Sequence, residues 1–230
     1  METQETHKTG VNIPQLLNSK PWIAVELLIV SIIIGFRLIP ITDTPVIFLI
    51  GWLTLRFRNL RWRDVGFEKP ENLGKAVGIG ALLACLYSPF ELFLLEPAIV
   101  SLTGQPVDLS QFAGIEGNLA NYLILLAIGW TLAAIMEEQV YRGYLMNRFS
   151  DLFGKNNLGW GLAVLITAVL FGIAHLYQGI TGVIMITFYG IFTGVLYLLT
   201  KRNLWPVMIF HGVFDTIGIT LLYLGKYPGV

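Results

Sequence analysis

Residues 157–176 read NLGWGLAVLITAVLFGIAHL, and this stretch contains no Asp, Glu, Lys or Arg. A helix of about 20 mostly apolar residues is long enough to cross the hydrocarbon core of a bilayer. The one ionisable side chain in the stretch is His175, close to its end. The stretch therefore predicts a transmembrane helix that carries a histidine near one end.

The composition of the whole chain is typical of a membrane protein. Its 230 residues are 55% hydrophobic and 13% charged, whereas soluble domains carry about 25% charged residues. The formal net charge of +0 gives no indication of a nucleic-acid partner. The single cysteine, Cys85, allows neither a disulfide within the chain nor a cysteine-based metal site. Membrane lipid is therefore the first expected partner.

Apolar segments recur along the chain and predict an all-α fold, a polytopic transmembrane bundle of about seven helices. Pro89 predicts a kink in the third segment. Residues 1–20 are polar and form a predicted N-terminal tail, and residues 21–230 form one transmembrane domain. The tail lacks the apolar core of a cleavable signal peptide. The predicted segments are residues 22–39, 45–57, 74–100, 119–141, 157–176, 180–200 and 203–224.

The distribution of basic residues predicts the orientation. Lys and Arg accumulate in cytoplasmic loops of membrane proteins. If the N-terminus is cytoplasmic, the predicted outer segments hold only Arg37 and Lys226, and all other basic residues lie inside. We therefore expect an integral membrane protein with a cytoplasmic N-terminus. The compact chain without a targeting signal indicates a prokaryotic plasma membrane.

The fourth segment ends in two adjacent carboxylates, Glu137 and Glu138, followed by Arg142. Ionisable groups in membrane spans are costly and usually face the interior of a bundle or a wet cavity. Glu138 and Arg142 are four residues apart, so they share a helix face and can pair. Glu137 points about 100° away from Glu138. It is left free for another task, such as general-base catalysis on water.

Two histidines and an aspartate lie in the segments that follow. Phe171 and His175 share one helix face, and His211 and Asp215 share another. The depth of each of these residues in the membrane follows from its distance in sequence to the nearest predicted cytoplasmic turn, at about 1.5 Å per residue. Glu137, His175, His211 and Asp215 then fall within about two helical turns of one depth. The sequence therefore predicts one shared site in an intramembrane cavity that faces the cytoplasm.

Other kinds of protein use buried polar residues as well. A lone buried His or Glu is most often an interhelical hydrogen-bonding residue, and we interpret Glu26, Glu91 and Glu96 as structural or as lining an access path. A proton-coupled transporter is an alternative function, although the chain shows no two related halves. A catalytically silent membrane scaffold is another alternative. A haem protein with His175 and His211 as axial ligands is the last.

The three motifs together resemble a known family. Glu-Glu-x-x-x-Arg at 137–142, Phe-x-x-x-His at 171–175 and His-x-x-x-Asp at 211–215 are similar, in order, to the motifs of the CPBP (CAAX-processing and bacteriocin-processing, or Abi) intramembrane proteases. The last position of the third motif is Asn or Asp in that family. The resemblance implies that residues 21–230 form a CPBP-type protease domain with a motif-bearing core at 119–224.

The resemblance also implies roles for the motif residues. Glu137 activates the attacking water with help from His175, and His211 and Asp215 bind or polarise the scissile carbonyl. The residues that hold the site together are Glu138, Arg142 and Phe171. The implied function is an intramembrane endopeptidase that hydrolyses membrane-anchored or lipidated peptides and proteins.

The family has been described both as metal-dependent and as metal-free. Zinc ligands would be Glu137, His175 and His211, because catalytic zinc commonly takes such ligands plus a water. The His-Glu-x-x-His helix motif of common zinc proteases is absent. We therefore favour a metal-free glutamate mechanism and keep zinc as the alternative cofactor.

Overall fold

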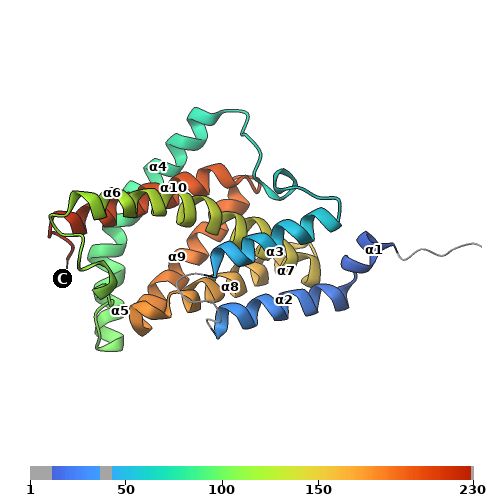
Figure 1. Cartoon of the computed structure of the whole chain (residues 1–230), viewed down its shortest axis with the longest axis horizontal. Coiled ribbons are helices and arrows are strands. Elements are labelled where there is room, and N and C mark those ends of the chain that lie inside the picture. Colours follow the sequence, from blue (N-terminus) through green and yellow to red (C-terminus); the bar gives the residue numbers. More distant parts are fainter. Residues whose placement is uncertain (1–11, 37–42, 229–230) are drawn as a thin grey trace, which may run out of the picture.

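The computed structural model describes residues 12–36 and 43–228, and the regular structure in these ranges is helical. The predicted tail at 1–11 and the end of the first predicted segment, 37–39, lie outside the described residues. Helix α1 and the C-terminal end lie at opposite ends of the molecule (Figure 1). The α-helices are α1 Ile13–Leu17, α2 Lys20–Gly35, α3 Thr44–Phe57, α4 Leu73–Phe90, α5 Glu96–Thr103, α6 Leu119–Ile128, α7 Met146–Phe153, α8 Asn157–Ala174, α9 Gly179–Leu199 and α10 Leu204–Tyr223.

Several of these helices join end to end through π-helical or 3₁₀ turns. The π-helical segments are η2 Glu91–Leu95, η4 Gly129–Glu137 and η5 Gln139–Leu145, and the 3₁₀ turns are η1 Trp62–Val65, η3 Ser110–Phe112 and η6 Leu176–Gln178. Within the described ranges, five continuous helices are long and apolar enough to cross a membrane. They are Leu73–Thr103, Leu119–Phe153, Asn157–Ala174, Leu176–Leu199 and Leu204–Tyr223. The chain thus has the character of an integral membrane protein.

The remaining two predicted segments form shorter helices. Helix α3 has 14 residues and α2 has 16. Helix α2 begins at Lys20, two positions before the predicted start, and α1 lies within the predicted polar tail. The all-α bundle of apolar helices is therefore confirmed, with five long helices in the described part and two short ones beside them.

The fourth predicted segment continues well past its predicted end at residue 141, because the helix runs without a break from Leu119 to Phe153. The prediction ended just before the first basic residue, Arg142. Arg142 and Arg148 are buried, however, and each is paired with a carboxylate inside the bundle. A rule based on hydropathy places a helix end wherever charge appears, and it cannot anticipate a partner on another helix.

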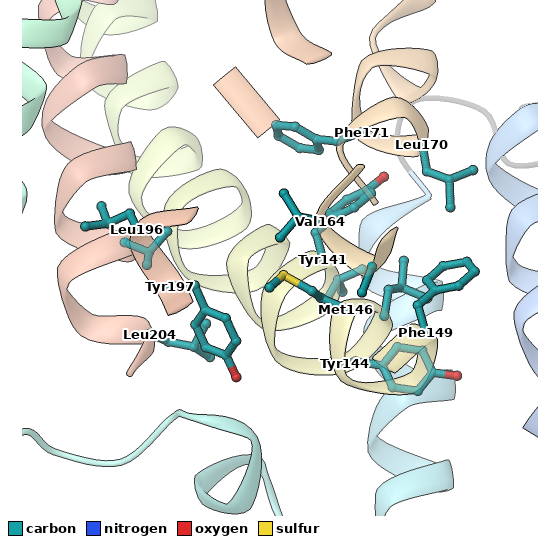
Figure 2. Close-up of a cluster of buried hydrophobic side chains, with 14 of the residues drawn as sticks. Tyr141, Tyr144, Met146, Phe149, Val164, Leu170, Phe171, Leu196, Tyr197 and Leu204 are labelled. Carbon is teal, nitrogen blue, oxygen red and sulfur yellow. The ribbon is translucent and has the colours of Figure 1, made fainter. Parts of the chain in front are cut away.

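The Leu119–Phe153 helix forms the centre of the bundle. Every residue from Glu138 to Met146 is buried, so this stretch has no exposed face. Figure 2 shows Tyr141, Tyr144 and Met146 of this helix within a cluster that includes Val164 and Phe171 of α8. A helix that is enclosed on all sides belongs to a core, and its side chains are held in fixed positions by their neighbours.

Helices α8 and α9 approach each other closely at small residues. A Cβ atom on Gly190 would lie 2.9 Å from the Cα of Ala168, and a Cβ on Gly194 would lie 3.0 Å from a side-chain atom of Val164. Small residues of this kind let helix backbones come together in membrane bundles. The packing fixes α9 against α8, the helix that ends at His175.

A buried ionic cluster ties α2 to the end of the central helix. Glu26 accepts hydrogen bonds from the Tyr144 hydroxyl, at 2.5 Å, and from Arg148 Nε, at 3.0 Å. Asp151 binds both Arg148, at 3.3 Å, and Arg58, at 3.0 Å. Burial and the nearby charge of Arg148 lower the pKa of Arg58, and the carboxylates of Asp151 and Glu26 oppose this shift. The structural interpretation of Glu26 is consistent with these contacts.

Candidate active site

Glu138 and Arg142 form the ion pair that their spacing predicts. Arg142 Nη1 donates to Glu138 Oε1 at 3.1 Å, and the two side chains are 2% and 0% exposed. The same carboxylate oxygen accepts from His211 Nδ1 at 2.7 Å. The sequence did not predict this second contact, which joins the central helix to α10. Glu138 therefore connects the first and third motifs directly.

Arg142 extends this network to two further helices. Its Nη2 donates to the carbonyl of Gly190, at 3.4 Å, and to the Thr193 hydroxyl, both on α9. The guanidinium carbon lies 4.7 Å from the centre of the Phe171 ring on α8, a cation–π contact. Phe171 of the second motif thus contacts the arginine of the first.

Glu137, at the end of η4, points away from this network and lines a cavity. The Thr44 hydroxyl donates to its Oε1 at 3.4 Å, from the start of α3. The two adjacent glutamates thus differ in surroundings. Glu138 is fully enclosed and held by Arg142 and His211, whereas Glu137 faces open space.

The hydrogen bonds of His175 identify its tautomer. His175 Nδ1 lies 2.8 Å from the carbonyl oxygen of Phe171. A carbonyl can only accept, so Nδ1 must donate, and Nε2 of the neutral ring then carries a lone pair. The ring also packs edge-on against Phe171, with centroids 4.8 Å apart. These contacts fix the ring while its basic nitrogen is left for other work.

His211 is held in a different way, between two carboxylates. Its Nδ1 meets Glu138, and its Nε2 lies 3.5 Å from Oδ2 of Asp215. The ring stands edge-on to Tyr189 with centroids 5.2 Å apart. An imidazole between two carboxylates can donate from both nitrogens. His175 is therefore placed to accept a proton and His211 to donate a hydrogen bond.

A cavity of about 520 Å³ brings the four predicted catalytic residues together. Glu137, His175, His211 and Asp215 all line it, on three different helical segments. Glu138 and Arg142 lie behind the cavity wall and connect the helices that form it.

The comparisons with known proteins bear on the same part of the chain. A family model described as "Type II CAAX prenyl endopeptidase Rce1-like" matches residues 119–217. Residues 119–217 are an Rce1-like domain. The match runs from α6 to Ile217 in α10 and contains all seven site residues that the motifs predict. This similarity supports an intramembrane protease as the function. Neither a curated protein nor a solved structure gave a significant match to the chain.

Some residues around the site were not predicted. Thr44 reaches Glu137 from outside the Rce1-like domain. Tyr189 and Thr193 both lie on α9, where Tyr189 contacts His211 and Thr193 contacts Arg142. Their spacing of four residues in an apolar segment places them on one face, and this signal was readable in the sequence. Thr44 offers no such signal, because its contact depends on the tertiary fold alone.

A catalytic zinc ion would place strict requirements on the side chains around the cavity. Catalytic zinc takes three protein ligands at about 2.0–2.2 Å. Within the described ranges, no three His, Cys, Asp or Glu side chains are grouped as metal ligands. Both nitrogens of His211 face carboxylates, and Nδ1 of His175 is bound to a carbonyl. The predicted alternative ligands Glu137, His175 and His211 do not fit a zinc site in this arrangement.

Proposed function

We propose that this protein is an endopeptidase that hydrolyses peptide bonds of membrane-anchored or lipidated substrates within the bilayer. The observation that carries the proposal is the shared cavity. A carboxylate with one weak hydroxyl contact, Glu137, lines the same space as a histidine with an available lone pair, His175. Paired acceptors of this kind are suited to orienting and deprotonating a water molecule.

In the proposed mechanism, Glu137 accepts a proton from a water that is also hydrogen-bonded to His175 Nε2. The water oxygen attacks the scissile carbonyl carbon, and a tetrahedral intermediate forms. The C–N bond then breaks, and the proton held by Glu137 passes to the leaving amine. The products are a carboxylic acid and an amine. The proton of the acid then passes to the amine to give a carboxylate and an ammonium group, so atoms and charge balance without a covalent enzyme intermediate.

The oxyanion of the tetrahedral intermediate needs hydrogen-bond donors that are already in place. We assign this role to His211, whose Nε2 faces the cavity beside Asp215. Glu138 holds the opposite nitrogen at 2.7 Å and is itself held by Arg142. The ion pair thus acts on the reaction through the position of His211 and not through contact with the substrate.

Lipidated or membrane-anchored substrates fit the surroundings of the site. The cavity lies in a bundle of apolar helices, and its wall combines the polar groups with apolar residues such as Leu132, Ile186 and Phe214. A peptide that is tethered to the membrane would be concentrated near such an opening. Orientation of the cavity toward the cytoplasm stays a prediction from the basic residues.

Product analysis tests this proposal. The purified protein in lipid nanodiscs is incubated with palmitoylated peptides in water enriched in ¹⁸O, and products are identified by mass spectrometry. We expect two fragments, with one ¹⁸O atom in the new carboxylate. The His175→Ala variant should give neither. Proton transport without any peptide cleavage across a broad peptide library would favour the transporter alternative and contradict the proposal.

A further inference from the structure

A second pair of carboxylates, distant in sequence from the motifs, lines the same cavity. Glu91 and Glu96 lie on the helix that runs from α4 through η2 to α5. Between them the helix is π-helical, and the Glu96 N–H bonds to the carbonyl of Glu91. Residues five apart stack in a π-turn, and such turns occur frequently at functional sites. Pro89 precedes the turn and lacks the backbone N–H of a regular helix.

Glu91 is buried, yet part of its carboxylate has no partner. The residue is 8% exposed, and its Oε2 makes no hydrogen bond to any residue that the structure describes. Tyr87, one helical turn earlier, is the polar neighbour that interacts with the carboxylate. An unpaired polar atom at this depth is costly. Because Glu91 also lines the cavity, its carboxylate indicates a place where a ligand would supply a partner.

The charges around the cavity specify the kind of ligand. The described residues that line it include the carboxylates of Glu91, Glu96, Glu137 and Asp215, and neither Lys nor Arg. The nearby Arg142 is behind the wall and already bound to Glu138. Charged groups in a bundle interior are normally paired with opposite charge. His211 meets Asp215 at 3.5 Å, whereas Glu91 and Glu96 have no basic side chain of this kind beside them in the described part of the chain. A bound cationic group would balance the charge of these two carboxylates.

The position of the pair connects it to the proposed reaction. Glu91 is close enough to Asp215 for the two charges to interact, and both line one cavity. Tyr227 donates to Glu96 Oε2 at 3.4 Å and so positions that carboxylate from the C-terminal side. A peptide whose scissile bond lies at Glu137 would therefore place a neighbouring side chain beside Glu91 and Glu96.

We propose that Glu91 and Glu96 form a specificity subsite that binds a Lys or Arg side chain of the peptide held in the cavity. The inference rests on the proposed protease function and names the substrate class that the site selects. The ammonium or guanidinium group would donate charge-assisted hydrogen bonds to the carboxylates of Glu91 and Glu96, interactions about twice as strong as neutral ones.

Binding to an inactive variant tests the subsite without relying on catalysis. The Glu137→Gln protein in nanodiscs is titrated with fluorescent palmitoylated peptides of Ala, Gly and Ser. Each peptide contains a single Lys, and the series moves this Lys through successive positions. For every position, a second peptide carries Nε-acetyl-lysine in place of Lys. At one or two adjacent positions, we expect the Lys peptide to bind at least about tenfold more tightly, a difference of about 1.4 kcal/mol. Arg should behave as Lys does.

Variants of the pair then assign the preference to these residues. Glu91→Gln, which keeps the size of the side chain, should reduce the ratio of Lys to acetyl-lysine affinities to within about twofold. Glu96→Lys should reverse the preference toward peptides with Glu at that position. The matched control is Glu116→Gln, because Glu116 is exposed and is not among the residues that line the cavity. It should leave the ratio unchanged.

The outcomes separate this inference from the proposed function. Equal affinity for Lys and acetyl-lysine at every position would overturn the subsite, and this comparison needs no variant at Glu91. Retention of the full ratio in a folded Glu91→Gln protein would overturn it as well. Selective binding of Lys peptides by a chain that cleaves none of them would support the subsite and contradict the protease.

Discussion

At the scale of single residues, the site depends on two adjacent glutamates that do different work. Glu138 is enclosed and bonded to Arg142 and His211, and Glu137 faces the cavity. Adjacent residues on a helix point about 100° apart, so one can enter a network while the other meets the substrate. This division was visible in the sequence, because only Glu138 is four residues from Arg142.

The Glu138–Arg142 pair predicts a stability defect when either partner is removed. Glu138→Ala or Arg142→Ala leaves one buried charge without its partner, which costs about 3–5 kcal/mol. Thermal melting in detergent should show a large decrease for each single variant. The double variant should melt higher than the less stable single variant. If it melts no higher than either one, the two residues are not coupled.

Asp215 offers a second test at this scale. An amide at the same position keeps the side-chain shape and can still contact His211 Nε2, 3.5 Å from Oδ2. We expect Asp215→Asn to keep peptide cleavage within about tenfold, whereas Asp215→Leu lowers kcat at least about a hundredfold, the usual range for loss of a positioned polar group. Equal activities of the two variants would show that Asp215 does not position His211.

At the scale of elements, the close approach of α8 and α9 fixes where His175 lies. Gly190→Val would bring side-chain atoms against Ala168, and overpacking of this kind costs about 1–3 kcal/mol or more. We expect a lower melting temperature and reduced cleavage. Gly78→Val is the matched control within a span, because a Cβ there meets nothing within 4 Å. Similar melting of both variants would contradict the packing argument.

The elements also show what the sequence can and cannot predict. Apolar runs located the helices, and i, i+4 spacing predicted the Glu138–Arg142 pair. The extension of the central helix to Phe153 was not predicted, because Arg148 is neutralised by Glu26 from a distant helix. The contact between His211 and Glu138 was not predicted either, because the two residues lie on different helices. Local spacing identifies partners on one helix, whereas contacts between helices depend on the tertiary arrangement.

At the scale of the whole molecule, the metal question is open to a direct test. The described side chains do not group as zinc ligands, so we expect activity to survive exhaustive chelation. Elemental analysis of protein purified without a polyhistidine tag should show no stoichiometric zinc. One zinc per chain, lost together with activity on chelation and regained with it, would overturn the metal-free mechanism.

The most direct test of the central claim is the rate of peptide cleavage by the Glu137→Gln variant. Glutamine keeps the shape of the side chain and the contact with Thr44, so the bundle should melt as the unmodified protein does. Loss of a general base lowers rates by about 10²–10⁴-fold. In nanodiscs, with Glu116→Gln as the control that stays active, we expect kcat to fall by at least about a hundredfold. Cleavage by a folded Glu137→Gln protein within about tenfold of the unmodified rate would contradict the account.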